Sequence, residues 1–305
     1  MPLSGIHHIT AITGDAPGNV DFYARVLGLR MLKKTVNQDD PTVYHLFYGD
    51  EDGTPGNDLT FFEYPGALPG KAGAGMVHRI VWRVASPASI DYWDVRLSTE
   101  GVDVARVDGR LRFSDPEGLE HELAVVATAD EPLTARHNEV PAEHALQGFD
   151  SVHAYHANPD ASADLLETAF GGVRDGDSWE VRSERRGSWI HYDQPPATAP
   201  LQGAGSVHHV AWASKPDELL DWRERVASLG LQITPEIDRF YFRSLYFREP
   251  SGVLFEIATE GPGFAVDESV ETLGERLSLP PNFEHVRERV EQTLQPLPDV
   301  RQWRP

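Results

Sequence analysis

The chain has 305 residues, 40% of them hydrophobic, and this length predicts about two domains. Its formal net charge of -21 argues against a nucleic-acid partner, because the phosphates would be repelled. The absence of cysteine excludes disulfides, thiolate metal ligands and a cysteine nucleophile. No apolar run approaches the ~20 residues of a membrane span, and the first residues lack a signal-peptide pattern. We therefore expect a cytoplasmic protein that binds neither nucleic acid nor a membrane.

Four segments of the chain begin alike, each with a strand, a polar turn and an amphipathic helix. They are residues 5–29, 75–101, 148–172 and 205–230. Strand-like pieces separated by turn residues follow each helix, so each repeat is expected to form a βαβββ module. One such module cannot cover both faces of its own sheet, which predicts that the modules pair.

The expected fold is α+β, with four βαβββ modules paired into two curved sheets. Residues 1–135 are expected to form a first domain of two modules, and residues 148–262 a second domain of two modules. A polar segment with prolines lies between them and reads as a linker.

Residues 263–305 are expected to form a C-terminal tail. It should contain a helix near residues 282–294, because Val286, Val290 and Leu294 recur at helical spacing. The last five residues are expected to be loosely held, as chain ends often are.

Two histidine doublets stand in apolar, strand-like runs, His7-His8 in the first module and His208-His209 in the fourth. Successive strand residues face opposite sides of a sheet, so one imidazole of each pair should face a site and the other a second layer. Glu256 places a carboxylate in a further apolar strand of the fourth module. Two imidazoles and one carboxylate are the ligands of a 2-His-1-carboxylate iron site, which keeps open positions for substrate and O2.

A comparison of the modules narrows this ligand set. The position of His8 and His209 is assigned to Arg79 in the second module and to Ala154 in the third. One metal site therefore most economically uses His8, His209 and Glu256. This choice predicts that the first module packs with the fourth, and the second with the third.

Two further carboxylates occupy the equivalent closing position in other modules. Glu122 is expected to be the remnant of a lost site, solvated or paired, for example with Arg79. Glu63 could instead be a fourth ligand, which would turn an open site into the closed site of a lyase or isomerase. The single histidines His78 and His153 are expected to be structural.

The doublets, the four modules and the closing Phe255-Glu256 resemble the vicinal oxygen chelate superfamily, which includes glyoxalases, bleomycin resistance proteins and extradiol dioxygenases. The similarity is closer to one branch, the hydroquinone-type ring-cleaving dioxygenases of the dichlorohydroquinone dioxygenase kind. The motifs that carry it span nearly the whole chain and are residues 5–10, 44–46, 53–56, 143–149, 207–209, 238–239, 252–256 and 263–268.

The resemblance implies two glyoxalase-like domains and an Fe(II) ion held by His8, His209 and Glu256, with Mn(II) as the alternative metal. It implies a non-haem, extradiol-type ring-cleavage dioxygenase whose partners are O2 and a small aromatic diol, of the hydroquinone or the catechol type. A homo-oligomer would fit the same family. The family's positions for proton and charge management fall on His7, Thr10, His208, Arg239 and Tyr246.

Two other functions stay open at this point. A glyoxalase-like lyase or isomerase with Zn, Ni or Mn would need Glu63 among the ligands. A non-catalytic protein that sequesters an aromatic compound or drug would need no metal, but it would not account for two intact doublets.

Overall fold

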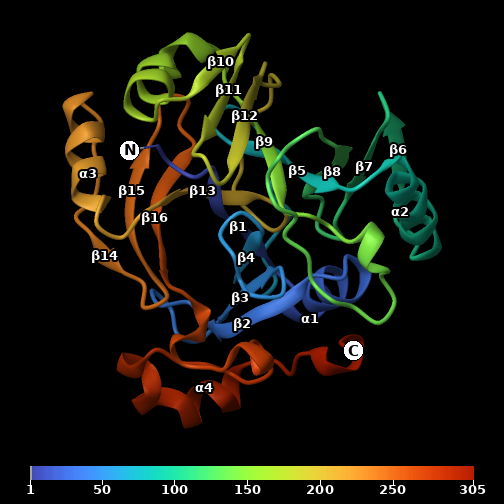
Figure 1. The fold of residues 1–305 in the computed structure, drawn as a ribbon. Coiled ribbons are helices and arrows are strands. Elements are labelled where there is room, and N and C mark those ends of the chain that lie inside the picture. Colours follow the sequence, from blue (N-terminus) through green and yellow to red (C-terminus); the bar gives the residue numbers. More distant parts are fainter. Residues whose placement is uncertain (1) are drawn as a thin grey trace.

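A computed structural model describes residues 2–305 and contains two curved eight-stranded sheets (Figure 1). The first sheet has the strand order β14-β15-β16-β13-β1-β4-β3-β2, and the second has the order β10-β11-β12-β9-β5-β8-β7-β6. The first sheet therefore combines the first module with the fourth, and the second sheet combines the second module with the third. The α+β fold and the module pairing expected from the sequence are confirmed.

Each module of the first sheet is a strand, a helical segment and three further strands. The first comprises β1 (Ile6–Thr13), α1 (Ala16–Val20), a π-helical turn (Asp21–Val26), β2 (Arg30–Val36), β3 (Tyr44–Gly49) and β4 (Asp58–Glu63). The fourth comprises β13 (Val207–Ser214), α3 (Leu219–Ser228), β14 (Ile237–Asp238), β15 (Phe242–Arg248) and β16 (Leu254–Pro262). The polar turn after β1 starts α1, because the Asp15 side chain accepts a hydrogen bond from the Gly18 amide at 3.2 Å.

The second sheet repeats this plan. The second module comprises β5 (Val77–Val84), α2 (Pro87–Thr99), β6 (Val104–Val107), β7 (Arg110–Ser114) and β8 (Glu120–Val125). The third comprises β9 (Phe149–Tyr155), a 3-10 turn (Pro159–Ser162), a π-helical segment (Asp164–Ala169), β10 (Val173–Asp175), β11 (Ser178–Arg182) and β12 (Gly187–Asp193). Gly101 adopts φ 78 just after α2, a left-handed conformation that suits glycine and ends the helix.

Each sheet has a central seam where its two modules meet. In the first sheet, β1 runs antiparallel to β13, with His8 opposite Ala211 and Thr10 opposite His209. In the second, β9 runs antiparallel to β5, with Ser151 opposite Val81. A register shift between Ile6 and His8 marks a β-bulge, an irregularity that re-aims neighbouring side chains.

The two sheets share one hydrophobic core, because helical segments of one sheet pack against the other. Tyr23, from the π-helical turn of the first module, donates its hydroxyl to Asp115 beside β8 at 2.9 Å. Phe170, at the end of the third module's helix, packs edge-on against Trp212 of β13 with ring centroids 5.9 Å apart. Helical segments of modules in each sheet therefore contact the other sheet.

The tail crosses the end of the first sheet, with α4 (Arg287–Thr293) following a 3-10 turn (Pro281–Val286) (Figure 1). The expected helical face is present, since Val290 is buried against Val36 of β2. The expectation of a loose end was wrong. Trp303 is 8% exposed and belongs to the main core, because its large indole finds an apolar site there. Among residues 2–305, no helix combines the length and apolarity needed to cross a membrane.

A buried lysine fastens the tail to β2. The Nζ atom of Lys33, which has no exposed surface, donates to the Phe264 carbonyl at 3.1 Å and to Asp267 Oδ1 at 2.7 Å. It also contacts the carboxylate of Glu268, itself almost fully buried. The tail motif at residues 263–268 therefore has a structural role, since it neutralises a charge that β2 brings into the interior.

We expect Lys33→Met to destabilise the protein by about 3–5 kcal/mol, because it leaves the Glu268 carboxylate buried without its main partner. Urea unfolding followed by circular dichroism measures this. Lys215→Met is the matched control, because Lys215 is 65% exposed, and its effect should stay below about 0.5 kcal/mol. Equal stability of the two variants would contradict the importance of this contact.

Candidate metal centre and its pocket

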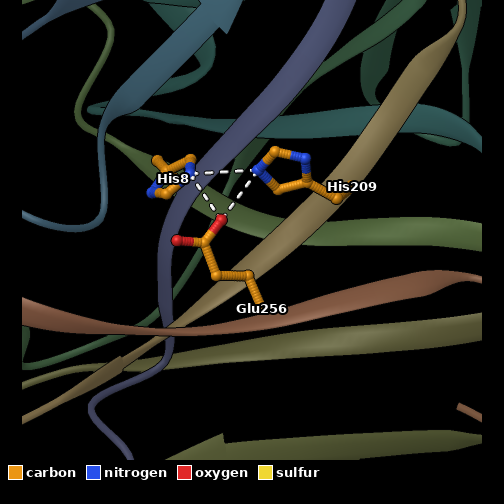
Figure 2. Close-up of side chains that lie close together, drawn as sticks. All are labelled: His8, His209 and Glu256. Carbon is orange, nitrogen blue, oxygen red and sulfur yellow. Dashed lines mark hydrogen bonds and ion pairs between the residues drawn. The ribbon is translucent and has the colours of Figure 1, made fainter. Parts of the chain in front are cut away.

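Three side chains from three neighbouring strands of the first sheet converge on one point (Figure 2). His8 Nε2 lies 3.2 Å from His209 Nε2 and 3.3 Å from Glu256 Oε2, and His209 Nε2 lies 2.8 Å from the same carboxylate oxygen. All three residues are buried. The structure thus brings together the three residues predicted as metal ligands.

The chemistry of this group fits a metal ion. Glu256 Oε2 is buried and accepts no hydrogen bond, whereas Oε1 accepts one from Ser244 Oγ at 2.5 Å. Burial alone would raise the pKa of Glu256, but the two imidazoles outweigh it and hold the pKa well below its usual range. An ionised carboxylate oxygen that faces two ring nitrogens is a donor set for a borderline divalent cation.

His7 fixes the ring of His8 from behind. Its Nε2 lies 3.1 Å from the Thr259 carbonyl, which can only accept, so this nitrogen carries the proton. Burial, together with the neighbouring His8, lowers the pKa of His7 to about 3, so the ring is neutral and its Nδ1 accepts from His8 Nδ1 at 3.0 Å. His8 therefore presents Nε2 to the centre, and His7 holds it as a second-layer partner.

His208 makes the equivalent contact with His209, their Nδ1 atoms lying 2.8 Å apart. Burial, and then the neighbouring His209, lower the pKa of His208 to about 4, so this ring is also neutral at pH 7. The two doublets are therefore arranged alike. In each, the second imidazole faces the centre, and the first imidazole orients the second. Unlike His7, His208 also lines the adjoining pocket.

A cavity of about 310 Å³ opens beside the triad. Aromatic side chains, among them Phe47, Phe62 and Phe242, share its walls with polar side chains such as Asn37 and Arg239. This composition is typical of sites for small, partly apolar ligands. His8 and His209 reach the cavity, as do Thr10, Arg239 and Tyr246 of the predicted set.

Arg239 and Tyr246 form one unit in the cavity wall. Arg239 Nε donates to the Tyr246 hydroxyl at 3.4 Å, and the guanidinium lies 5.5 Å from the centre of the tyrosine ring. Burial and the charge of Glu256 raise the pKa of Tyr246, so its hydroxyl keeps its proton. Since that oxygen accepts from Arg239, its O–H is free to donate into the cavity.

Sequence reasoning gave no role to His45, although it quoted the motif that contains it. His45 lines the cavity, and its Nε2 lies 3.1 Å from Thr60 Oγ1, which lies 2.8 Å from Thr10 Oγ1. Burial and the nearby His8 hold the pKa of His45 well below its usual range. The alternation of β3 could have indicated an inward-facing His45, but the hydroxyl chain to Thr10 depends on strand pairing that the sequence does not reveal.

Asp58 was also missed. It stands opposite His8 on β4, is 1% exposed, and neither carboxyl oxygen has a hydrogen-bond partner. Burial raises the pKa of Asp58 to about 8, so the carboxyl is mostly protonated at neutral pH.

Glu63 lies apart from the triad. It stands opposite Thr13 rather than His8, and its Oε2 accepts a hydrogen bond from the Tyr44 amide at 3.1 Å. Among residues 2–305, the group that could hold a metal ion at this point is His8, His209 and Glu256. This arrangement favours a three-ligand centre over the four-ligand alternative.

Other residues stand at the equivalent positions of the second sheet, and its register corrects one assignment. Ser151, opposite Val81, takes the place of His8, opposite Ala211, so the assignment of Ala154 was wrong by three residues. That assignment relied on matching His153 to a doublet, whereas His153 corresponds to Thr10.

Glu122 has the place of Glu256, and arginines surround it. Its carboxylate lies 3.6 Å from Arg79, 2.7 Å from Arg110 and 2.5 Å from Arg112. The expected pairing of Glu122 with Arg79 is therefore present. Guanidinium groups occupy the place beside this carboxylate that a metal ion would take in the first sheet.

Comparisons with known proteins agree with this architecture. The chain is 43% identical over 301 residues to MhqO of Bacillus subtilis, provisionally named a ring-cleaving dioxygenase, with 96% of each chain covered. It is 33% identical over 313 residues to a chlorohydroquinone/hydroquinone 1,2-dioxygenase of Sphingobium indicum, again with 96% of each chain covered.

Solved structures give the same result for the fold. The crystal structure of a provisionally named dioxygenase from Bacillus subtilis matches with a TM-score of 0.90 at 41% identity, covering 97% of this chain and 98% of that one. Maize glyoxalase I matches with a TM-score of 0.59 at 16% identity, covering 84% of this chain and 92% of that one, which supports the fold alone.

The family model of the Glyoxalase/Bleomycin resistance protein/Dioxygenase superfamily matches residues 5–123 and 148–257, one segment in each half of the chain. These segments contain all four modules apart from the last residues of β8 and β16, and all three residues of the candidate metal centre. The resemblance expected from the histidine doublets is confirmed, and this chain belongs to the Glyoxalase/Bleomycin resistance protein/Dioxygenase superfamily.

Proposed function

We propose that this protein is an Fe(II)-dependent, non-haem ring-cleaving dioxygenase of the extradiol type that acts with O2 on a hydroquinone-type aromatic diol. The observation that carries the proposal is the buried group of His8, His209 and Glu256 at the wall of an aromatic cavity. The names of the relatives from Bacillus subtilis and Sphingobium indicum support it. The expected cytoplasmic location and homo-oligomeric state stay predictions.

The metal would be held by two imidazole nitrogens and one carboxylate oxygen, a donor set suited to Fe(II) and also to Mn(II). Bound there, the ion would supply the redox chemistry through which the diol and O2 react. The ionised Glu256 provides the negative charge that a divalent ion requires in a buried site. The raised pKa of His8, which Glu256 causes against the effect of burial, means that a proton competes with the metal for this site.

The side chains that line the cavity can bind and orient the substrate. A substrate ring can pack against Phe62 and Phe242, and Arg239 can stabilise the negative charge of a phenolate. Tyr246 can donate its hydroxyl proton to a ring oxygen from a fixed position.

The neutral imidazole of His208 can orient a ring oxygen. With His209 Nδ1 donating to His208 Nδ1, the Nε2 atom of His208 keeps its hydrogen and can donate a hydrogen bond to that oxygen. Thr10 can accept or donate through its hydroxyl, and its contact with Thr60 continues to His45. Of the residues predicted for proton and charge management, Thr10, His208, Arg239 and Tyr246 line this cavity, whereas His7 lies behind His8.

A glyoxalase-like lyase is less well supported, because Glu63 bonds to the Tyr44 amide instead of joining the triad. A non-catalytic binding protein would leave a buried, ionised Glu256 beside two imidazoles without a purpose. The ring-cleavage proposal accounts for both the triad and the cavity.

Protein loaded anaerobically with Fe(II) is expected to consume O2 when hydroquinones are added, and to stop when the iron is chelated. His209→Ala removes one ligand, so bound iron and O2 uptake should both fall by at least about 100-fold, or ~2.7 kcal/mol. An oxygen electrode and metal analysis measure the two effects. His285→Ala, at an exposed position in the tail, is the matched control and should change neither.

Full iron occupancy and activity in His209→Ala would show that the ligand assignment is wrong. Turnover of a methylglyoxal–thiol adduct, with no O2 uptake on any diphenol, would indicate a lyase instead.

Tyr246→Phe is expected to lower kcat by about 10²–10⁴-fold, the usual contribution of a positioned proton donor. Iron content should not change, because the hydroxyl lies outside the triad. Single-turnover kinetics with hydroquinone measure this effect, and Tyr92→Phe on α2 is the control. An unchanged kcat would remove Tyr246 from the proton path.

His7→Phe is expected to weaken metal binding by about 10–100-fold, because the new ring has the same shape but cannot accept from His8 Nδ1. Calorimetric titration of the metal-free protein with Mn(II) measures the affinity. His285→Phe provides the comparison. Unchanged affinity in His7→Phe would mean that His7 only fills space beside His8.

A further inference from the structure

We propose that the second sheet contains a second metal site, formed by His78, His153 and Asp193, that binds a borderline divalent ion such as Zn2+. This site is separate from the proposed catalytic centre and does not depend on it. Sequence reasoning took both histidines to be structural, so the proposal departs from that expectation.

The three side chains have the geometry of a ligand group. His78 Nε2 lies 2.8 Å from Asp193 Oδ2, and His153 Nδ1 lies 2.9 Å from the same oxygen. One donor atom from each residue lies within 4.8 Å of the others. In the first sheet, the imidazole–carboxylate distances are 2.8 and 3.3 Å, so the imidazole–carboxylate contacts of the two groups are similar in length.

The strands hold these donors rigidly. His78 is on β5, His153 on β9 and Asp193 on β12, which are consecutive neighbours in the second sheet. Tyr155 stacks on the His78 ring with centroids 4.0 Å apart and a 14° angle between the planes. His191 packs against His153 with ring centroids 4.6 Å apart, so both imidazoles have fixed orientations before any ligand binds.

A second, independent observation points to a cation. His78 Nδ1 is buried and has no hydrogen-bond partner, and the Glu120 carboxylate lies 3.8 Å away. If Nε2 donates to Asp193, the lone pair of Nδ1 faces that negative charge. If Nε2 binds a metal, the proton moves to Nδ1 and faces Glu120, which gives the carboxylate–histidine–metal arrangement common in metalloproteins.

This site is not the degenerate copy of the first one. The positions equivalent to His209 and Glu256 are Arg79 and Glu122, which form an ion pair. The proposed ligands are different residues, and Asp193 is 44% exposed at its side chain. An ion there would be accessible from solvent, whereas the first group is buried.

The test is calorimetric titration of the metal-free, full-length protein with Zn2+. The unmodified protein should bind two equivalents, His153→Ala one, His209→Ala one, and the double variant none. Asp193→Asn, which preserves the side-chain shape, should also bind one equivalent. His285→Ala is the control at an exposed position and should bind two.

Glu120→Gln should keep two equivalents but weaken the second site by about 10–100-fold, the effect expected of an outer carboxylate partner. Thermal melts of each variant check that the fold is intact.

The proposal is overturned if His153→Ala and Asp193→Asn, both folded, bind as many equivalents as the unmodified protein. A single equivalent in the unmodified protein that disappears in His209→Ala also overturns it. If the single equivalent instead persists in His209→Ala and disappears in His153→Ala, the second site stands and the first assignment fails.

Discussion

The antiparallel pairing of β1 with β13 is the constraint on which the first sheet and its centre depend. It sets Thr10 opposite His209 and His8 opposite Ala211, while the parallel pairing of β13 with β16 sets Ala211 opposite Glu256. Three side chains that are far apart in sequence thereby converge on one face. A slip of one residue in either pairing would turn the side chains of a strand to the opposite face and separate them.

The surrounding structure offsets the free-energy cost of burying these polar groups. A buried carboxylate costs several kcal/mol unless charges and hydrogen bonds offset it, and Glu256 has two imidazoles and Ser244 as partners. His7 and His208 add a further layer that directs ring nitrogens towards the carboxylate. The same principle holds where Lys33 meets Glu268, since both the candidate metal centre and the tail contact are built around buried ionic groups.

Sequence patterns predicted the features that repeat. The doublets, the closing glutamate and the periodic helices recur at similar spacing, so the fold, the module pairing and the convergence of His8, His209 and Glu256 followed from them. Features of the structure that do not recur between modules could not be predicted from these sequence patterns. The place of Ser151 required the strand register, and the burial of Trp303 required knowledge of the surface that it meets. The contacts of His45 and Asp58 likewise depend on which strands become neighbours.

The three candidate ligands come from the first and the fourth module, and this has a consequence for synthesis on the ribosome. His8 leaves the exit tunnel early, but Glu256 follows only after the second and third modules have been made. Until then β1 can pair with β4, while its other edge waits for β13. An unpaired apolar strand edge can pair with an incorrect strand or with another chain. Until the fourth module has been made, His8 therefore lacks His209 and Glu256, and the second sheet can be complete before the first one closes.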